Sequence, residues 1–99
     1  PSSDPQKKAL LSYVNGYKKI YKVEGDHFGG HAWDAMMLLK NAIERGGDSP
    51  AAIRDQLEKT EKFAGIGGTF TYSAHDHAGL SKDAFVIVEI RKGDWKLVK

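Results

Sequence analysis

Two histidines flank an aspartate at His75-Asp76-His77, and these residues are the part of the sequence most typical of a metal site. On a strand, alternate imidazoles share one face and can bind Zn²⁺ or Ni²⁺. The sequence has no cysteine, however, and neither His27 nor His31 stands at a spacing that would supply a third ligand. An aspartate in a loop also accepts hydrogen bonds from the residues that follow it and so sets a turn. We therefore favour a turn and predict no metal ion here.

Asp34 and the run Gly65-Ile66-Gly67-Gly68 are two further candidates for chemistry. Asp34 could act as a general base, but it lies in the first turns of a predicted helix, where the macrodipole favours a carboxylate by about 0.3–1 kcal/mol. The glycine run could bind a phosphate, but it lacks the Lys-Ser/Thr of a P-loop and leads into a strand. We interpret Asp34 as structural and the run as a turn. With no Gly-x-Ser-x-Gly turn and no cysteine nucleophile either, the sequence predicts neither an enzyme nor a cofactor.

Length and composition narrow the class of protein. The chain has 99 residues, enough for one small domain, of which 28% are charged and 40% hydrophobic, as in soluble globular proteins. A formal net charge of +2 is too small to indicate nucleic-acid binding. No apolar run approaches the ~18 residues of a membrane span. Because the sequence begins at Pro1 without an initiator methionine or signal peptide, we expect the numbering to begin inside a longer protein.

Hydrophobic periodicity and capping residues predict three helices, at residues 5–22, 27–45 and 50–59. Asp4, Asp26 and Ser49 are the expected caps. The second helix has the strongest apolar stripe, formed by Ala32, Ala35, Met36, Leu39 and Ile43. Trp33, Met37 and Leu38 fall outside that stripe, so we expect the first turns of this helix to be covered on more than one side.

After residue 63 the pattern changes to alternation, which predicts three short strands, at residues 68–73, 84–91 and 94–98. The last two are joined by a hairpin turn. Three helices followed by a short three-stranded antiparallel segment make an α+β fold in two layers. The helical faces are too apolar for three strands to cover, so we expect that a larger partner surface is missing.

Four stretches follow one another in a specific order and spacing. Residues 28–35 carry an aromatic-Asp-Ala helix start, 65–70 a glycine turn into a strand, 76–80 an Asp-His-x-Gly-Leu loop, and 86–95 a strand hairpin with glycine at its turn. Together they resemble the C-terminal quarter of the solute-binding proteins of branched-chain-amino-acid-type ABC transporters, the type I periplasmic binding proteins. The resemblance covers nearly the whole chain. It implies that residues 1–99 form a single C-terminal fragment of a two-lobed α/β fold that closes over a small polar solute.

The resemblance also implies a function. The chain would belong to an extracytoplasmic, periplasmic solute-binding component of an ABC importer, a binding protein and not an enzyme. Its ligand would be an amino acid, an amide or a small aromatic acid, and its protein partner a membrane permease. No nucleic acid and no cofactor would be involved.

One ligand contact is favoured by the resemblance. In the family, the residue at the position of Phe28 tends to face the ligand cleft, and Gly29 and His31 are its neighbours. On the residues alone, an aromatic at a helix start is more often a hydrophobic staple onto the next turn. Gly29-Gly30 stands where the family usually has alanine or a larger residue, and Trp33 where it has tyrosine, which leaves the shape of the cleft wall open.

Two other functions remain open from the sequence alone. The chain could be a free-standing protein-interaction module that binds an acidic partner through the lysines of its first helix, or a small hydrolase or metal enzyme built on residues 75–77. In any of these cases we expect the isolated chain to self-associate, because its central helix and its strand at residues 85–90 are too apolar to face water. The expected interface includes Trp33, Met37, Leu38 and that strand.

Overall fold

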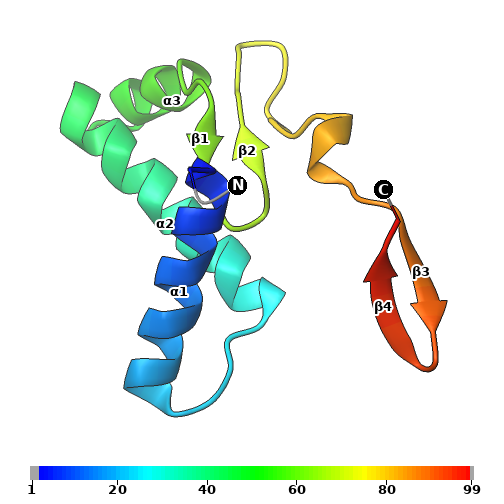
Figure 1. Cartoon of the computed structure of the whole chain (residues 1–99). Helices are drawn as coiled ribbons and strands as arrows, with labels where there is room; N and C mark the ends of the chain where they lie inside the picture. The colour runs from blue at the N-terminus through cyan, green and yellow to red at the C-terminus, as the bar shows by residue number, and fades with distance from the viewer. Residues whose placement is uncertain (1–2, 99) are drawn as a thin grey trace.

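The computed structural model describes residues 3–98, which form three helices and two separate two-stranded antiparallel sheets (Figure 1). The helices are α1 (Pro5–Tyr21), α2 (His27–Gly46) and α3 (Pro50–Glu58). The strands are β1 (Phe63–Ala64), β2 (Thr69–Phe70), β3 (Val88–Arg91) and β4 (Asp94–Leu97), with a 3-10 helix, η1 (Lys82–Ala84), before β3. The α+β class and the three helices are confirmed, but four strands are present where the sequence predicted three. Within residues 3–98, no helix combines the length and hydropathy needed to span a membrane.

Each helix begins at the capping residue that the sequence predicted. The side chains of Asp4, Asp26 and Ser49 accept hydrogen bonds from backbone N–H groups two or three residues ahead, at 2.9, 2.8 and 3.2 Å. These bonds satisfy donors that have no partner inside the helix. At the other end of α2, Gly47 has a φ of 92°, a conformation that favours glycine. Local chemistry therefore sets the limits of the helices.

The strands differ from the prediction because a ladder needs a partner as well as a suitable composition. β1 pairs with β2 across the glycine turn, with Phe63 opposite Phe70, and the sequence pattern did not reveal β1. The predicted strands at residues 68–73 and 84–91 are shortened to β2 and β3. Residues 85–87 precede β3 without joining a ladder. The side chains of Val86 and Ile87 favour an extended backbone. Ile87 accepts one hydrogen bond, from the N–H of Val98 (2.8 Å), but the regular ladder begins at Val88.

The buried face of α2 is not the apolar stripe that the sequence predicted. The buried residues of α2 recur at every fourth position, as Gly30, Asp34, Leu38 and Ala42. Met36, at the centre of the predicted stripe, is 64% exposed. The prediction took the most apolar face as the buried one. In the structure, α3 packs closely against α2 and the β1–β2 turn closes onto its first half, and such close approach favours small side chains.

Asp34 is the polar centre of this buried face. Its side chain is 2% exposed. Asp34 Oδ1 accepts a hydrogen bond from the N–H of Ile66 (2.7 Å), and Oδ2 accepts one from the N–H of Gly67 (2.8 Å). The glycine run is therefore a turn, and its N–H groups bind an anion that belongs to the chain itself. The structural role predicted for Asp34 is confirmed, but its basis is different. Asp34 joins α2 to the turn by two hydrogen bonds that span 32 and 33 residues, in addition to any effect of the helix macrodipole.

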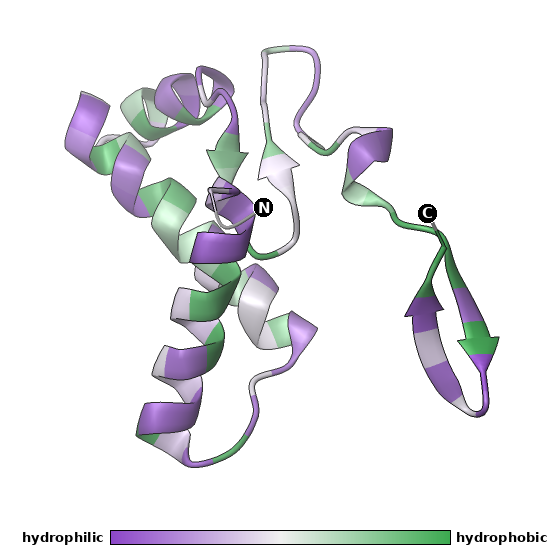
Figure 2. Ribbon diagram, viewed as in Figure 1, coloured by the Kyte–Doolittle hydropathy of each residue, from purple (hydrophilic) through white to green (hydrophobic). Residues whose placement is uncertain are grey.

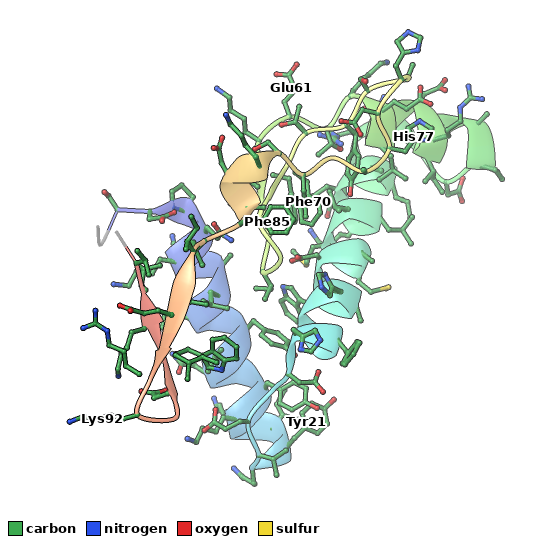
Figure 3. The ribbon with its side chains drawn as sticks, turned by 90° about the vertical axis from the view of Figure 1, so that its right-hand side faces the viewer. Tyr21, Glu61, Phe70, His77, Phe85 and Lys92 are labelled. Carbon is green, nitrogen blue, oxygen red and sulfur yellow. The ribbon has the colours of Figure 1, made fainter. Side chains whose placement is uncertain are left out.

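The β3–β4 hairpin stands apart from the helices as an arm (Figure 1). Its register places Val88 opposite Leu97 and Ile90 opposite Trp95, so that one face is apolar. Figure 2 shows green and purple residues alternating along β3. The opposite face carries ion pairs. Figure 3 shows Phe85 where the arm leaves the body and Lys92 at the far tip.

The arm makes the chain unusually extended. The radius of gyration is 15.7 Å, compared with about 13 Å for a globular domain of this length. Ile90, Trp95 and Leu97 are each about two-thirds exposed. Because an isolated two-stranded hairpin is marginal in water, the apolar face of the arm needs a cover that residues 3–98 do not provide.

We predict that Asp34→Ala destabilises the chain by about 3 kcal/mol, because it leaves two shielded N–H groups without an acceptor. Urea unfolding followed by circular dichroism measures the change. Asp55→Ala is the matched control: Asp55 is half exposed and pairs with its neighbour Arg54, so its loss should cost no more than about 0.5 kcal/mol. Equal effects of the two substitutions would contradict the role given to Asp34.

We also predict that the isolated chain forms dimers at micromolar concentration, because it exposes an apolar face and unpaired strand edges. The sequence analysis placed Leu38 in this interface, but Leu38 is buried and Met37 is half-buried. Trp33, residues 85–88 and Ile90 are exposed, as that interface requires. Ile90→Lys, on the apolar face of the arm, should give monomers by light scattering. Glu89→Gln, on the opposite face, should leave the dimer intact. A monomeric wild-type chain that melts cooperatively would refute this prediction.

Candidate functional site

The first two turns of α2 present an exposed group of rings, His27, Phe28 and His31, which we call the aromatic cluster. Phe28 is 72% exposed, so it is not a hydrophobic staple. The ring centroids of His27 and Phe28 are 4.1 Å apart, and those of His27 and His31 are 6.4 Å apart with the rings perpendicular. The cluster therefore combines one phenyl ring with two imidazoles that can donate or accept hydrogen bonds.

Tyr13 of α1 fixes the start of α2 beneath this cluster. The Tyr13 hydroxyl donates a hydrogen bond to the backbone oxygen of Asp26 (3.1 Å), and the Asp26 carboxylate caps the helix. Burial raises the pKa of the Tyr13 hydroxyl above its ordinary value, and the nearby Tyr17 and Asp26 add to the shift. The hydroxyl thus remains a donor throughout the physiological range.

Gly29 and Gly30 let the first turn of α2 pack closely against its neighbours. A Cβ on Gly29 would overlap the Tyr13 hydroxyl, and a Cβ on Gly30 would lie 2.7 Å from Ile66 Cγ2. Close packing therefore explains why glycine stands at positions 29 and 30, where the family that the sequence resembles usually has alanine or a larger residue. Gly29 faces Tyr13, whereas its neighbour Phe28 faces outward.

His31 lies on the turn that Asp34 holds. A Cβ on Gly67 would lie 3.1 Å from His31 Cε1 and 3.2 Å from Nδ1, so the imidazole edge packs against the Gly67 backbone. The structure brings Phe28 and His31 to one exposed end of α2. The sequence analysis missed Tyr13, Ile66 and Gly67, which support these residues. The paired glycines at a helix start were the one signal of close packing.

An apolar groove runs between α1 and the first half of α2. It has a volume of about 450 Å³ and is lined by Ser12, Tyr13, Gly16, Tyr17, Ile20, Tyr21, Gly29, Ala32, Trp33 and Met36. Within it, the Tyr13 ring lies against Tyr17 and Trp33, with centroids 5.7 and 6.1 Å apart. Neither Phe28 nor His31 lines the groove, so it is a separate surface from the aromatic cluster.

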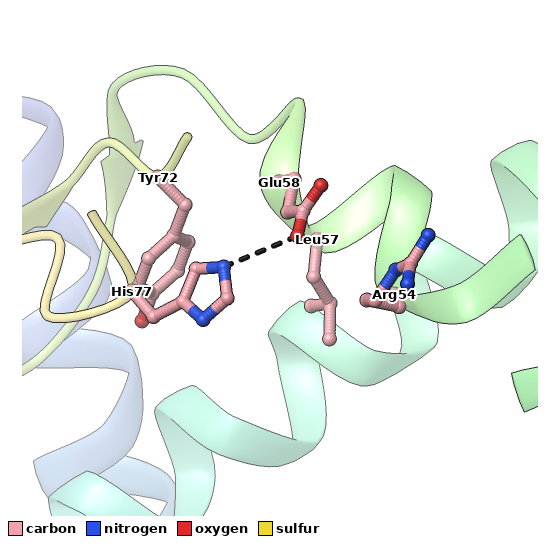
Figure 4. Close-up of a pocket in the computed structure, with 5 residues that line it drawn as sticks. All are labelled: Arg54, Leu57, Glu58, Tyr72 and His77. Atoms are coloured by element: carbon pink, nitrogen blue, oxygen red, sulfur yellow. Dashed lines mark hydrogen bonds and ion pairs between the residues drawn. The ribbon is translucent and has the colours of Figure 1, made fainter. Parts of the chain in front are cut away.

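A smaller hollow of about 220 Å³ lies between α3 and the loop that follows β2 (Figure 4). Its lining consists of Arg54, Leu57, Glu58, Tyr72 and His77. His77 Nε2 lies 3.1 Å from Glu58 Oε1, the contact drawn as a dashed line. Burial raises the pKa of the Tyr72 hydroxyl, with smaller contributions from the carboxylates of Asp34 and Asp76.

The segment His75-Asp76-His77 forms the turn that the sequence favoured. The Asp76 carboxylate accepts hydrogen bonds from the N–H groups of Ala78 (2.9 Å) and Gly79 (3.2 Å). Of the two histidines, His77 reaches across to α3. Over residues 3–98, no three side chains of histidine, cysteine, aspartate or glutamate come together as a metal site.

A family model described as periplasmic binding protein matches residues 1–94. No curated protein matches the chain. Among solved structures, an extracellular ligand-binding receptor from Rhodopseudomonas palustris HaA2 is 32% identical over 99% of this chain, with a TM-score of 0.85. Rp1789 of Rhodopseudomonas palustris strain CGA009 (22% identity, TM-score 0.80) and another extracellular ligand-binding receptor from that species (20%, 0.79) match over the whole chain and share its fold. The chain spans 30% of the length of each of these three proteins.

We predict that Gly29→Ala destabilises the chain by about 1–3 kcal/mol, because the added methyl group must displace the Tyr13 hydroxyl. Tyr13→Phe removes the oxygen that the methyl group meets. In a double-mutant cycle, the free energy of unfolding of the variant that carries both substitutions should therefore fall by less than the sum of the decreases for the two single variants. Gly16→Ala, with nothing within 4 Å of its Cβ, is the control and should not destabilise. Strict additivity would show that Gly29 does not pack on Tyr13.

Proposed function

The chain belongs to the periplasmic binding protein family, and we propose that it is the C-terminal segment of an extracytoplasmic solute-binding protein that serves an ABC importer. One observation carries the proposal: a chain of 99 residues matches a receptor more than three times its length, from end to end, at 32% identity and a TM-score of 0.85. Like its family, the protein is periplasmic or otherwise extracytoplasmic.

The proposed mechanism is closure of two lobes over a small molecule. A solute that binds the closed state more tightly than the open one shifts the population toward closure. The membrane permease of the importer would then recognise the closed form. In this scheme the 99 residues contribute one wall of the cleft and part of the connection between the lobes.

The aromatic cluster is the proposed part of the cleft wall. Solute sites are concave and mostly apolar, with a few polar groups that fix orientation. Phe28, exposed at the start of α2, offers a flat apolar surface, and the exposed His31 offers ring nitrogens three residues further along the helix. Gly29, the third predicted residue, faces Tyr13 and contributes by letting the first turn of α2 pack closely on α1 behind the two rings. An amino acid, an amide or a small aromatic acid matches this combination.

The lysines of α1 give little support to the alternative of an interaction module for an acidic partner. Lys18 pairs with Glu24 at 2.5 Å, and Lys22 donates a hydrogen bond to the backbone oxygen of Lys19. Glu24 therefore offsets the charge of Lys18, and the side-chain end of Lys22, just after α1, is turned back onto the helix.

We predict that Phe28→Ala in the full-length protein lowers solute affinity at least fivefold, about 1 kcal/mol, and shifts the melting temperature of the unliganded protein little. Calorimetric titration with L-leucine, L-phenylalanine, acetamide and benzoate measures the affinity. Met36→Ala is the matched control, since Met36 is similarly exposed on the same helix but lies more than two turns away. A large loss of stability with unchanged affinity would show that Phe28 is a packing residue and not part of the site.

A further inference from the structure

We infer that Asp34 is a positioning residue for solute recognition, which acts on His31 through the turn at residues 65–68. The inference rests on the proposed function, because His31 is one of the residues proposed for the cleft wall. Asp34 itself is buried and touches no solute. Its role is to hold the surface on which the His31 ring packs.

The first step is that Asp34 fixes the turn by hydrogen bonds. Its two carboxylate oxygens bind two consecutive N–H groups, those of Ile66 and Gly67, at 2.7 and 2.8 Å. Two bonds to adjacent peptides fix both the distance and the orientation of the turn relative to α2. The N–H of Gly65 donates to the backbone oxygen of Gly68 (2.8 Å) and closes the turn on itself. Charge-assisted bonds of this kind are roughly twice as strong as neutral ones.

The second step is the contact between the turn and the site. The two residues that Asp34 binds are also the two that touch the start of α2. Ile66 packs on Gly30, and the Gly67 backbone packs on the His31 ring. Gly30 and His31 precede Asp34 by four and three residues, so all three lie on neighbouring positions of one helix face. The carboxylate, the turn and the imidazole therefore form one continuous contact.

The third step is the consequence for recognition. One edge of the His31 ring is against Gly67, which leaves the rest of the exposed ring for contact with a solute. A polar group selects a ligand well only when it is held close to the required geometry by the residues behind it. A change in the turn should therefore alter solute affinity without touching the solute.

Gly67→Ala is the sharpest variant. Its Cβ would lie 3.1 Å from His31 Cε1 but 3.5 Å from Asp34 Oδ2, so it crowds the imidazole and spares the carboxylate. Gly67 does not have a positive φ, and alanine can adopt its conformation. Gly16→Ala is the matched control, since nothing lies within 4 Å of that position. Asp34→Asn is a second variant, which cannot accept both hydrogen bonds.

The experiment uses the full-length protein and two readouts. Histidine-selective NMR follows the Cε1–H signals of His31 and, as an internal reference, of His75, which is exposed in the loop after β2. Calorimetry measures affinity for whichever of L-leucine, L-phenylalanine, acetamide and benzoate binds wild type most tightly. Gly67→Ala should shift the His31 signal, leave the His75 signal in place, and lower affinity about fivefold to thirtyfold. In a His31→Ala background, Gly67→Ala should change affinity less than twofold. Asp34→Asn should give the same pattern.

Two results would overturn the inference by itself. One is an unshifted His31 signal in both Gly67→Ala and Asp34→Asn. The other is an affinity loss of the same size with and without the His31 ring, which is the behaviour of a purely structural residue. If none of the four probes binds, or if His31→Ala leaves affinity unchanged, the proposed function or its site is wrong and the inference falls with it.

Discussion

The carboxylate of Asp34 is almost entirely removed from water, and the N–H groups of Ile66 and Gly67 are what compensate that desolvation. An unpaired buried carboxylate would cost several kcal/mol, so α2 and the β1–β2 turn are bound to form together. The packing around the first half of α2 follows from this pairing. The turn cannot approach the carboxylate unless the residues around it are small. Gly30 beneath Ile66, and Gly67 against His31, meet that requirement.

The same pairing explains which parts of the fold the sequence could predict. Where a helix begins depends on residues close together in the sequence, and the capping residues Asp4, Asp26 and Ser49 predicted the three helix starts correctly. The partner of Asp34 lies more than thirty residues away, and no local pattern identifies it. β1 was missed for a similar reason, since a two-residue strand is defined only by its partner across the turn.

The apolar pattern failed in an informative way. It marked the stripe of Met36 on α2 as buried and the whole of residues 84–91 as a strand, and both segments are exposed here. Apolar periodicity reports that a surface needs a cover, but it does not say which segment covers it. The apolar pattern did not identify the candidate site residues either. Only resemblance to a family pointed to Phe28, and the structure adds its exposure and its ring neighbours.

The aromatic cluster is supported by packed residues behind it, whereas the β3–β4 arm is not. The support of the cluster comes from within the described residues: Tyr13 holds the start of α2, and the turn bound by Asp34 holds His31. The arm of β3 and β4 has no such support. The wall of the proposed cleft is therefore held by contacts within residues 3–98. Ordering flexible groups on binding costs affinity. In the proposed mechanism, a preformed wall would therefore leave lobe closure as the main structural change for a solute to drive.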